Sequence, residues 1–125
     1  MQKLLTALVA LIALVMLGLG LNFMFNPVTM AAQFALVPDG IVGLNTIRGD
    51  LGGLFLASAM MLAVGLARGQ QVWFLAVAVL MGSIALGRFL GFVIDGFAGN
   101  NLPAFLLEIV FVVVLVLAHR RTPPP

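Results

Sequence analysis

Long apolar runs occur four times along the sequence, at about residues 4–25, 43–66, 72–94 and 103–119. A helix rises about 1.5 Å per residue, so a run of ~20 residues crosses the ~30 Å hydrocarbon core of a bilayer. The runs are continuous rather than alternating, which favours membrane helices over the strands of a membrane β-barrel. The pattern therefore predicts an all-α, integral membrane four-helix bundle, with residues 1–125 forming a single transmembrane domain.

A proline separates the first run from a shorter apolar segment. Pro27 disfavours helix at the residue before it, so the first crossing ends near Phe25. Asn26 can cap a new helix that has Pro27 in its first turn, and we expect a short helix at about residues 28–36 to lie at the membrane surface. The residues expected to face lipid there are Val28, Met30, Ala31 and Phe34. A cleaved signal peptide is the alternative for the first run, but its apolar region would be only about 7–15 residues long.

Composition supports the membrane assignment, because the chain is 63% hydrophobic and only 8% charged, against about 25% charged residues in a typical soluble domain. Cysteine and tyrosine are absent and His119 is the only histidine, which excludes disulfides, thiolate metal sites and haem held by two histidines of one chain. No basic, aromatic-rich patch suited to nucleic acid is present. We predict no catalytic residue, metal ligand set or cofactor. The expected partner is the lipid bilayer, with other membrane subunits or a homo-oligomer as further options.

If the four crossings alternate in direction, the basic and acidic residues fall on opposite sides of the membrane. Lys3, Arg68 and the pair Arg120 and Arg121 fall on one side, which the positive-inside rule assigns to the cytoplasm. The acidic residues fall on the other side or in its half of the bilayer, and they are Asp39, Asp50, Asp95 and Glu108. We therefore expect a multi-pass protein of the bacterial inner membrane with both termini in the cytoplasm.

Three ionisable residues on three different crossings fall at one level in this arrangement. Arg48, Arg88 and Glu108 each lie about 5–6 residues inside the outer end of a crossing, or roughly 7–9 Å deep. A charged side chain facing lipid costs about 2.5–3.5 kcal/mol at the helix centre, so we expect all three to turn inward, where Glu108 accepts hydrogen bonds from both guanidinium groups. This predicts a buried salt bridge. Further polar residues near this level complete the predicted cluster: Asp95, Asp50, Asn45 and Asn22.

Small residues next to the two arginines are predicted to let the helices approach closely. Glycines spaced four apart occur beside each arginine, and such pairs allow helix backbones to pack closely in lipid. We expect the second and third crossings to pack along these stripes, which would set Arg48 near Arg88. The stripes consist of Gly49, Gly52 and Gly53 on the second crossing and Ser83, Gly87 and Gly91 on the third.

The cluster permits three interpretations. It can be a structural ion network that fixes helix register, with Glu108 and Asp95 neutralising the arginines. It can be a binding site, open to the outer face or outer leaflet, for an anionic or amphipathic molecule. A proton or ion pathway is the third interpretation, and it is disfavoured because no second ionisable residue lies deeper in the bilayer. The charge count does not decide between the first two, because two arginines face three carboxylates.

The order of several short motifs resembles that of a family of small bacterial four-helix membrane proteins, catalogued as domain of unknown function four-three-four-five. The likeness covers about residues 4–118, and its most specific part is NxIRGxxGG at residues 45–53. The other motifs are Phe25-Asn26-Pro27, Gly87-Arg88, Asp95-Gly96 and Glu108. The resemblance implies the four-helix fold and no particular reaction. The chain is also distantly similar to the DoxX group, some members of which are linked to quinone-dependent oxidation, but no motif here carries that activity over.

Three functions are open at this point. The first is a non-enzymatic membrane protein, either an accessory subunit or a binder of a lipid or a small anionic or amphipathic ligand, that uses Arg48, Arg88 and Glu108. The second is a DoxX-like, quinone-linked oxidoreductase subunit whose arginines contact a quinone carbonyl. The third is a small transporter or channel that works as an oligomer. A closed cluster in a monomer would favour the first, a bound quinone the second, and a continuous polar path the third.

Overall fold

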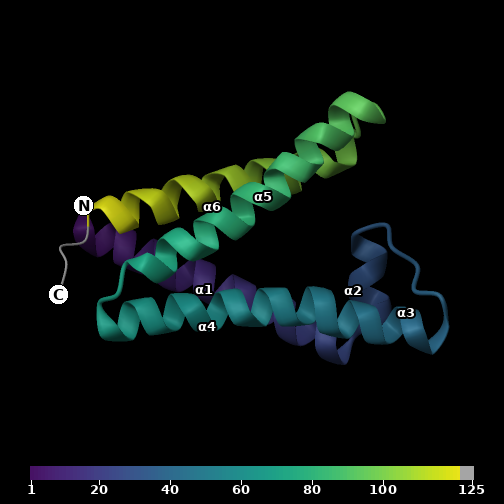
Figure 1. Cartoon of the computed structure of the whole chain (residues 1–125), viewed down its shortest axis with the longest axis horizontal. Coiled ribbons are helices and arrows are strands. Elements are labelled where there is room, and N and C mark those ends of the chain that lie inside the picture. The colour runs from purple at the N-terminus through teal and green to yellow at the C-terminus, as the bar shows by residue number, and fades with distance from the viewer. Residues whose placement is uncertain (122–125) are drawn as a thin grey trace. The chain divides into compact units, whose positions relative to one another are not determined.

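The chain is almost entirely helical over the part that the computed structural model describes, residues 1–121 (Figure 1). No strand occurs within these residues, so the predicted all-α class is confirmed. One of the elements is a π-helical turn, η1, and another is a short 3-10 turn, η2. In chain order the elements are α1 (Gln2–Phe25), α2 (Pro27–Gln33), α3 (Gly40–Thr46), η1 (Ile47–Gly52), α4 (Gly53–Arg68), α5 (Val72–Ile94), η2 (Gly99–Asn101) and α6 (Leu102–Arg121).

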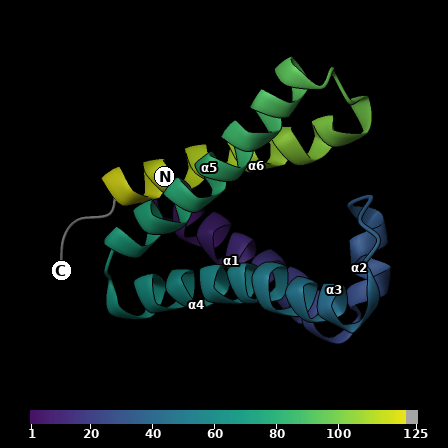
Figure 2. The same ribbon diagram turned by 45° about the vertical axis from the view of Figure 1, so that its right-hand side comes forward.

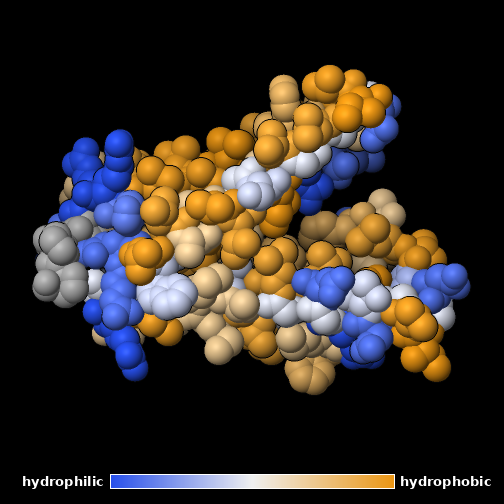
Figure 3. Space-filling view, in the orientation of Figure 1, coloured by the Kyte–Doolittle hydropathy of each residue, from blue (hydrophilic) through white to orange (hydrophobic). Residues whose placement is uncertain are grey.

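Four helical segments in residues 1–121 are long and apolar enough to cross a membrane. They are Gln2–Phe25, Gly40–Arg68, Val72–Ile94 and Gly99–Arg121. In each segment, at most 28% of an apolar stretch of 18 residues is buried. Hydrophobic side chains cover much of the face visible in Figure 3. An apolar surface of this extent suits lipid rather than water. The four segments therefore indicate a multi-pass membrane protein.

The ends of these segments lie close to the predicted ones. The third crossing, Val72–Ile94, has the predicted bounds. The second begins at Gly40; Asp39 occupies the N-cap position, and its backbone carbonyl accepts a hydrogen bond from the Gly43 N–H at 3.0 Å. It continues to Arg68, where Gly69, at φ +63°, ends the helix in the left-handed conformation. The backbone N–H of Gln70 then bonds the Gly65 carbonyl at 3.0 Å and closes the helix end.

The chain forms two compact units. The first, which we call the middle unit, comprises residues 10–63. The second, which we call the hairpin unit, comprises residues 1–9 together with the described chain from Val64 onward. Helices α1 and α4 each contribute residues to both units, and the single domain expected from the chain length stays a prediction.

Phe23 of α1 lies at the centre of the core of the middle unit. Its ring centroid lies 5.4 Å from that of Phe34 and 5.7 Å from that of Phe55, and the Phe55 ring is stacked on it. Aromatic pairs of this kind add about 0.5–1.5 kcal/mol beyond the burial of their area. The other buried members of this core are Met30, Ala31 and Ile47. The core therefore joins the end of α1 to α2 and to the π-helical turn.

The short helix α2 begins as predicted but faces differently. Asn26 is its N-cap residue and Pro27 stands in its first turn. Met30 and Ala31 are buried in the core of the middle unit, whereas Val28 is exposed. The expectation that Met30 and Ala31 face lipid is therefore wrong, because α2 turns its apolar side toward the Phe23 ring.

Two glycines let α1 lie close to the second crossing within the middle unit. A Cβ atom at Gly20 would lie 2.7 Å from the backbone nitrogen of Leu56 on α4. A Cβ atom at Gly52 would lie 2.7 Å from Cγ of Met24 and 3.4 Å from the Gly20 carbonyl oxygen. A side chain at Gly20 would push the two backbones apart, and one at Gly52 would displace the Met24 side chain. Small residues allow this close packing in membranes.

Helices α5 and α6 run side by side in opposite directions and form the main part of the hairpin unit (Figures 1 and 2). At the connecting turn, the ring of Phe92 packs against Phe97 at 5.3 Å and Phe105 at 5.6 Å. At the other end of the two helices, Nδ1 of His119 lies 3.0 Å from the carbonyl oxygen of Gln71. The residues buried between these ends are Phe74, Val77, Ala78, Met81 and Ala85 of α5 and Phe111, Leu115 and Ala118 of α6.

Gly20→Ala tests the close approach in the middle unit. The added Cβ would meet backbone atoms of α4, which cannot swing aside like a side chain, so we expect a loss of about 1–3 kcal/mol of unfolding free energy. Gly18→Ala is the matched control on the same helix, because its Cβ would meet nothing within 4 Å. Thermal unfolding in one detergent, followed by circular dichroism, should give a lower melting temperature for Gly20→Ala. Equal melting temperatures for the two variants would contradict this packing.

Candidate functional site

Arg88 and Glu108 form an ion pair between the two long helices of the hairpin unit. Nε of Arg88 on α5 donates a hydrogen bond of 2.7 Å to Oε1 of Glu108 on α6. Arg88 stands six residues before Ile94, where α5 ends, and Glu108 stands six residues after Leu102, where α6 begins. Both side chains are thus roughly 9 Å along their helices from the connecting turn. The antiparallel course of the helices brings them to the same level.

The ion pair is only partly buried. The side chain of Arg88 is 23% exposed and that of Glu108 is 13% exposed, so the prediction of a buried salt bridge is wrong in this respect. The pair spans α5 and α6, and a long arginine side chain can extend along a helix surface while its head stays accessible. The guanidinium can therefore reach a molecule outside the hairpin.

Hydrogen-bonding capacity is left over on both partners. Oε2 of Glu108 is buried and has no hydrogen-bond partner among the described residues. The guanidinium of Arg88 has five N–H groups, and within residues 1–121 only its Nε is engaged. A buried polar atom without a partner costs about 1–3 kcal/mol, and more when it is charged. The pair can therefore offer further donors at the partly exposed Arg88, whereas the unpartnered oxygen of Glu108 is closed off from the surface.

Arg48 lies in the middle unit and binds the end of a helix. Its Nη1 donates a hydrogen bond to the backbone carbonyl of Met24. Met24 belongs to the last turn of α1, where carbonyl groups lack partners within the helix, and this turn contains no basic residue of its own. The guanidinium thus supplies the positive charge that the negative end of a helix dipole favours.

The π-helical turn η1 places Arg48 at this position. A π turn is wider than an α turn and is often found at functional sites. Here it directs Ile47 into the Phe23 core and sets Gly52 against α1. The NxIRGxxGG stretch therefore has a local structural role in joining the second crossing to the end of α1. The predicted bond from Arg48 to Glu108 stays a prediction, because the two residues belong to different units.

The remaining polar members of the predicted cluster are all exposed. Nδ2 of Asn22 donates to the Gly18 carbonyl of its own helix at 2.7 Å. In the part of the chain that the structure describes, the side chains of Asn45, Asp50 and Asp95 have no hydrogen-bond or ion-pair partner. Asn22, Asn45 and Asp50 belong to the middle unit and Asp95 to the hairpin unit, so their membership of one cluster with the Arg88–Glu108 pair stays a prediction.

The glycines of the predicted stripes make no close contact within their own units, except for Gly52. A Cβ atom at any of the four glycines spaced four apart would meet nothing within 4 Å, and these are Gly49, Gly53, Gly87 and Gly91. Gly52 does make a close contact, but with α1. The hydroxyl of Ser83 donates to the Val79 carbonyl of its own helix at 2.8 Å. Packing of the second crossing on the third along these stripes stays a prediction.

Two groups that hold Arg48 and α1 in place were not predicted from the sequence. One is the Met24 carbonyl, which accepts the hydrogen bond of Arg48. The other is Gly20, which opposes Leu56 across the helix contact. A signal for the first was available, because α1 ends without a basic residue in its last turn and helix ends of this kind favour a nearby cation.

Comparison with known proteins gives one match. The family model described as Domain of unknown function (DUF4345) matches residues 4–119, which is nearly the whole chain. No curated protein and no solved structure matches the chain. The match confirms the resemblance to the family of unknown function, whose description assigns no activity. The distant likeness to the DoxX group stays a prediction.

A double-mutant cycle tests whether Arg88 and Glu108 are energetically coupled. Arg88→Ala and Glu108→Ala should each destabilise the protein in detergent, because each leaves the other charge without its partner. The double variant should cost about 0.5–3 kcal/mol less than the sum of the single losses. Arg88→Ala combined with Asp95→Ala is the control, since Asp95 is exposed and has no partner among the described residues. Additive losses in the Arg88–Glu108 cycle would show that the side chains are not coupled.

Arg48→Ala tests the role of Arg48 at the end of α1. We expect it to lower the unfolding free energy by about 1–2 kcal/mol, because it removes a charged hydrogen bond to the Met24 carbonyl. Arg48→Lys should retain part of this stability, since the positive charge remains. Asp50→Ala changes an exposed residue of the same turn and serves as the control. Equal stability of the Arg48→Ala and Asp50→Ala variants would argue against the helix-end role.

Proposed function

This chain belongs to the family described as Domain of unknown function (DUF4345), and we propose that it is a bacterial inner-membrane protein that binds a ligand without transforming it. The ligand is a lipid or another small amphipathic molecule whose polar group reaches Arg88 and Glu108 in the outer half of the membrane. The protein then acts as an accessory subunit or binding protein, alone or with further membrane subunits.

One observation carries this proposal: the Arg88–Glu108 pair is incomplete. The side chain of Arg88, in which only Nε is bonded among the described residues, is partly exposed, and Oε2 of Glu108 is buried without a partner among them. Ionisable residues inside apolar membrane helices are costly and mark functional sites by default. A purely structural pair would be expected to satisfy its own atoms. An incomplete pair of opposite charges suits a polar head group that accepts bonds from Arg88.

The distribution of charge supports the proposed orientation. In the hairpin unit, Arg68, Arg120 and Arg121 lie where α4 and α6 end, whereas Asp95 lies where α5 ends. The positive-inside rule assigns the basic ends to the cytoplasm. Both termini are then cytoplasmic, and the Arg88–Glu108 pair lies in the outer half of the bilayer.

A quinone is the second candidate ligand. The N–H groups of Arg88 that make no bond among the described residues suit a carbonyl oxygen as well as an anion. A bound quinone would support the relation to DoxX-like, quinone-linked oxidoreductase subunits that was expected from the sequence. Identifying the molecule that copurifies with the protein would show whether the ligand is a quinone or a lipid.

Native mass spectrometry of the purified protein tests the proposed function. We expect wild-type protein, extracted in a mild non-ionic detergent and supplied with a total membrane lipid extract, to retain an amphipathic molecule at this pair. Arg88→Gln and Glu108→Gln should each lower its occupancy at least several-fold, because each removes a charged hydrogen-bonding group. Asp95→Asn is the control, since it removes a charge of the same hairpin at an exposed position.

The mass of the retained molecule also separates the two candidates, because a quinone and a phospholipid differ in mass. Equal occupancy in wild type and in all three variants would contradict binding at the Arg88–Glu108 pair. Absence of any retained molecule from wild type would contradict the binding function itself.

A further inference from the structure

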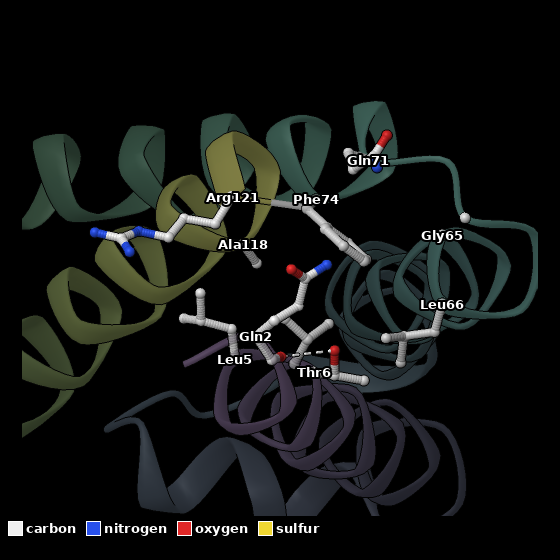
Figure 4. Close-up of a pocket in the computed structure, with 11 residues that line it drawn as sticks. Gln2, Leu5, Thr6, Gly65, Leu66, Gln71, Phe74, Ala118 and Arg121 are labelled. Atoms are coloured by element: carbon white, nitrogen blue, oxygen red, sulfur yellow. Dashed lines mark hydrogen bonds between the residues drawn. The ribbon is translucent and has the colours of Figure 1, made fainter. Parts of the chain in front are cut away.

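A second polar site lies at the opposite end of the hairpin unit from the Arg88–Glu108 pair. A cavity of about 90 Å³ lies among the first turns of α1, the end of α4, the start of α5 and the end of α6 (Figure 4). Its walls are partly apolar, with Leu5, Phe74 and Ala118 among the lining side chains. All of these residues belong to the hairpin unit.

Polar groups reach this cavity from two helices. The side-chain amide of Gln2 on α1 points into the space in Figure 4, and Arg121 of α6 lines the rim with its guanidinium extending outward. The hydroxyl of Thr6 also lines the cavity and donates to the Gln2 carbonyl at 3.0 Å. The amide offers N–H donors inside the cavity, and the arginine offers charged donors at its mouth.

The charge around this cavity is positive. Lys3, Arg68, Arg120 and Arg121 all stand within three residues of a helix end at this end of the hairpin unit. The carboxylates of the unit, Asp95 and Glu108, belong to the other end of α5 and α6. Helices α1 and α5 begin here, and the start of a helix favours an anion. Helices α4 and α6 end here, and basic residues in their own last turns offset their negative ends.

We propose that this cavity binds the phosphate group of an anionic phospholipid from the leaflet at the basic end of the helices. The cavity lies where apolar membrane segments end, which is the level of the lipid head groups. The phosphate oxygens accept hydrogen bonds from the Gln2 amide and the Arg121 guanidinium. The glycerol backbone lies against the apolar wall at Leu5 and Phe74. The site shares no residue with the Arg88–Glu108 pair and is independent of the function proposed for that pair.

The chain contains a built-in reporter for this site. Trp73 is its only tryptophan, and Nε1 of its indole donates to Oε1 of Gln70 at 3.0 Å. Trp73 stands between Gln71 and Phe74, which both line the cavity. We expect a group that enters the cavity to shift Gln71 or Phe74 and thereby to alter the surroundings of the neighbouring indole, which tryptophan fluorescence would follow.

The experiment titrates the full chain in a non-ionic detergent with short-chain phosphatidylglycerol. We expect a saturable fluorescence change, retention of one lipid in native mass spectrometry, and binding about tenfold weaker for phosphatidylcholine with the same acyl chains. Inorganic phosphate is the third ligand, and it should bind far more weakly because it lacks the glycerol and acyl groups. Phosphate binding as tight as that of the lipid would overturn the assignment to a phospholipid.

Two neighbouring arginines provide matched variants. Arg121→Gln removes a cavity-lining cation, whereas Arg120→Gln removes the same charge from an exposed residue that does not line the cavity. We expect Arg121→Gln to weaken phosphatidylglycerol binding about tenfold more than Arg120→Gln does. Gln2→Leu should also weaken it, without changing the net charge. Equal effects of the two arginine variants, or no saturable lipid binding by wild type, would overturn the proposal.

Discussion

The need to give the charges on apolar membrane helices a partner governs the structure around the candidate site. A guanidinium or carboxylate that faces lipid alone is costly, and the chain deals with the two arginines that lie within its crossings, the partly buried Arg88 and the exposed Arg48, in different ways. Arg88 bonds the carboxylate of Glu108 across the α5–α6 hairpin. Arg48 bonds a backbone carbonyl at the end of α1. The first arrangement leaves N–H groups of Arg88 free for a ligand, whereas the second completes a helix end.

This difference separates structure from candidate function within one sequence. The NxIRGxxGG stretch is the motif most specific to the family. In the middle unit it forms a π-helical turn, a contact of Gly52 with α1 and a hydrogen bond from Arg48 to the end of α1. All three features stabilise the fold. The shorter motifs, Gly87-Arg88 and Glu108, form the pair whose oxygen Oε2 has no partner among the described residues. The proposed ligand site therefore rests on the less specific part of the sequence.

Much of the fold could be predicted from the sequence, because long apolar runs indicate membrane helices and the prolines and glycines between them indicate where the helices end. Counting residues from helix ends also placed Arg88 and Glu108 at one level, since antiparallel neighbours convert sequence position into depth. The partner of Arg48 could not be predicted in this way, because every residue has a backbone carbonyl and the sequence does not mark which one accepts the bond. The π turn could not be predicted either, since it is a change of hydrogen-bond register. The buried side of α2 depends on where the Phe23 ring lies, which the sequence does not show.

The most direct measurement is the distance between an arginine nitrogen and the Glu108 carboxyl carbon in lipid bilayers. Glu108 is the only glutamate in the sequence, so ¹³C-glutamate and ¹⁵N-arginine labelling with dipolar-recoupling solid-state NMR isolates this contact. A direct pair, with Nε 2.7 Å from Oε1, predicts strong dephasing of the glutamate carboxyl signal that disappears in Arg88→Gln. A carboxyl signal with no nearby arginine nitrogen in the wild type would contradict the ion pair on which the candidate site rests.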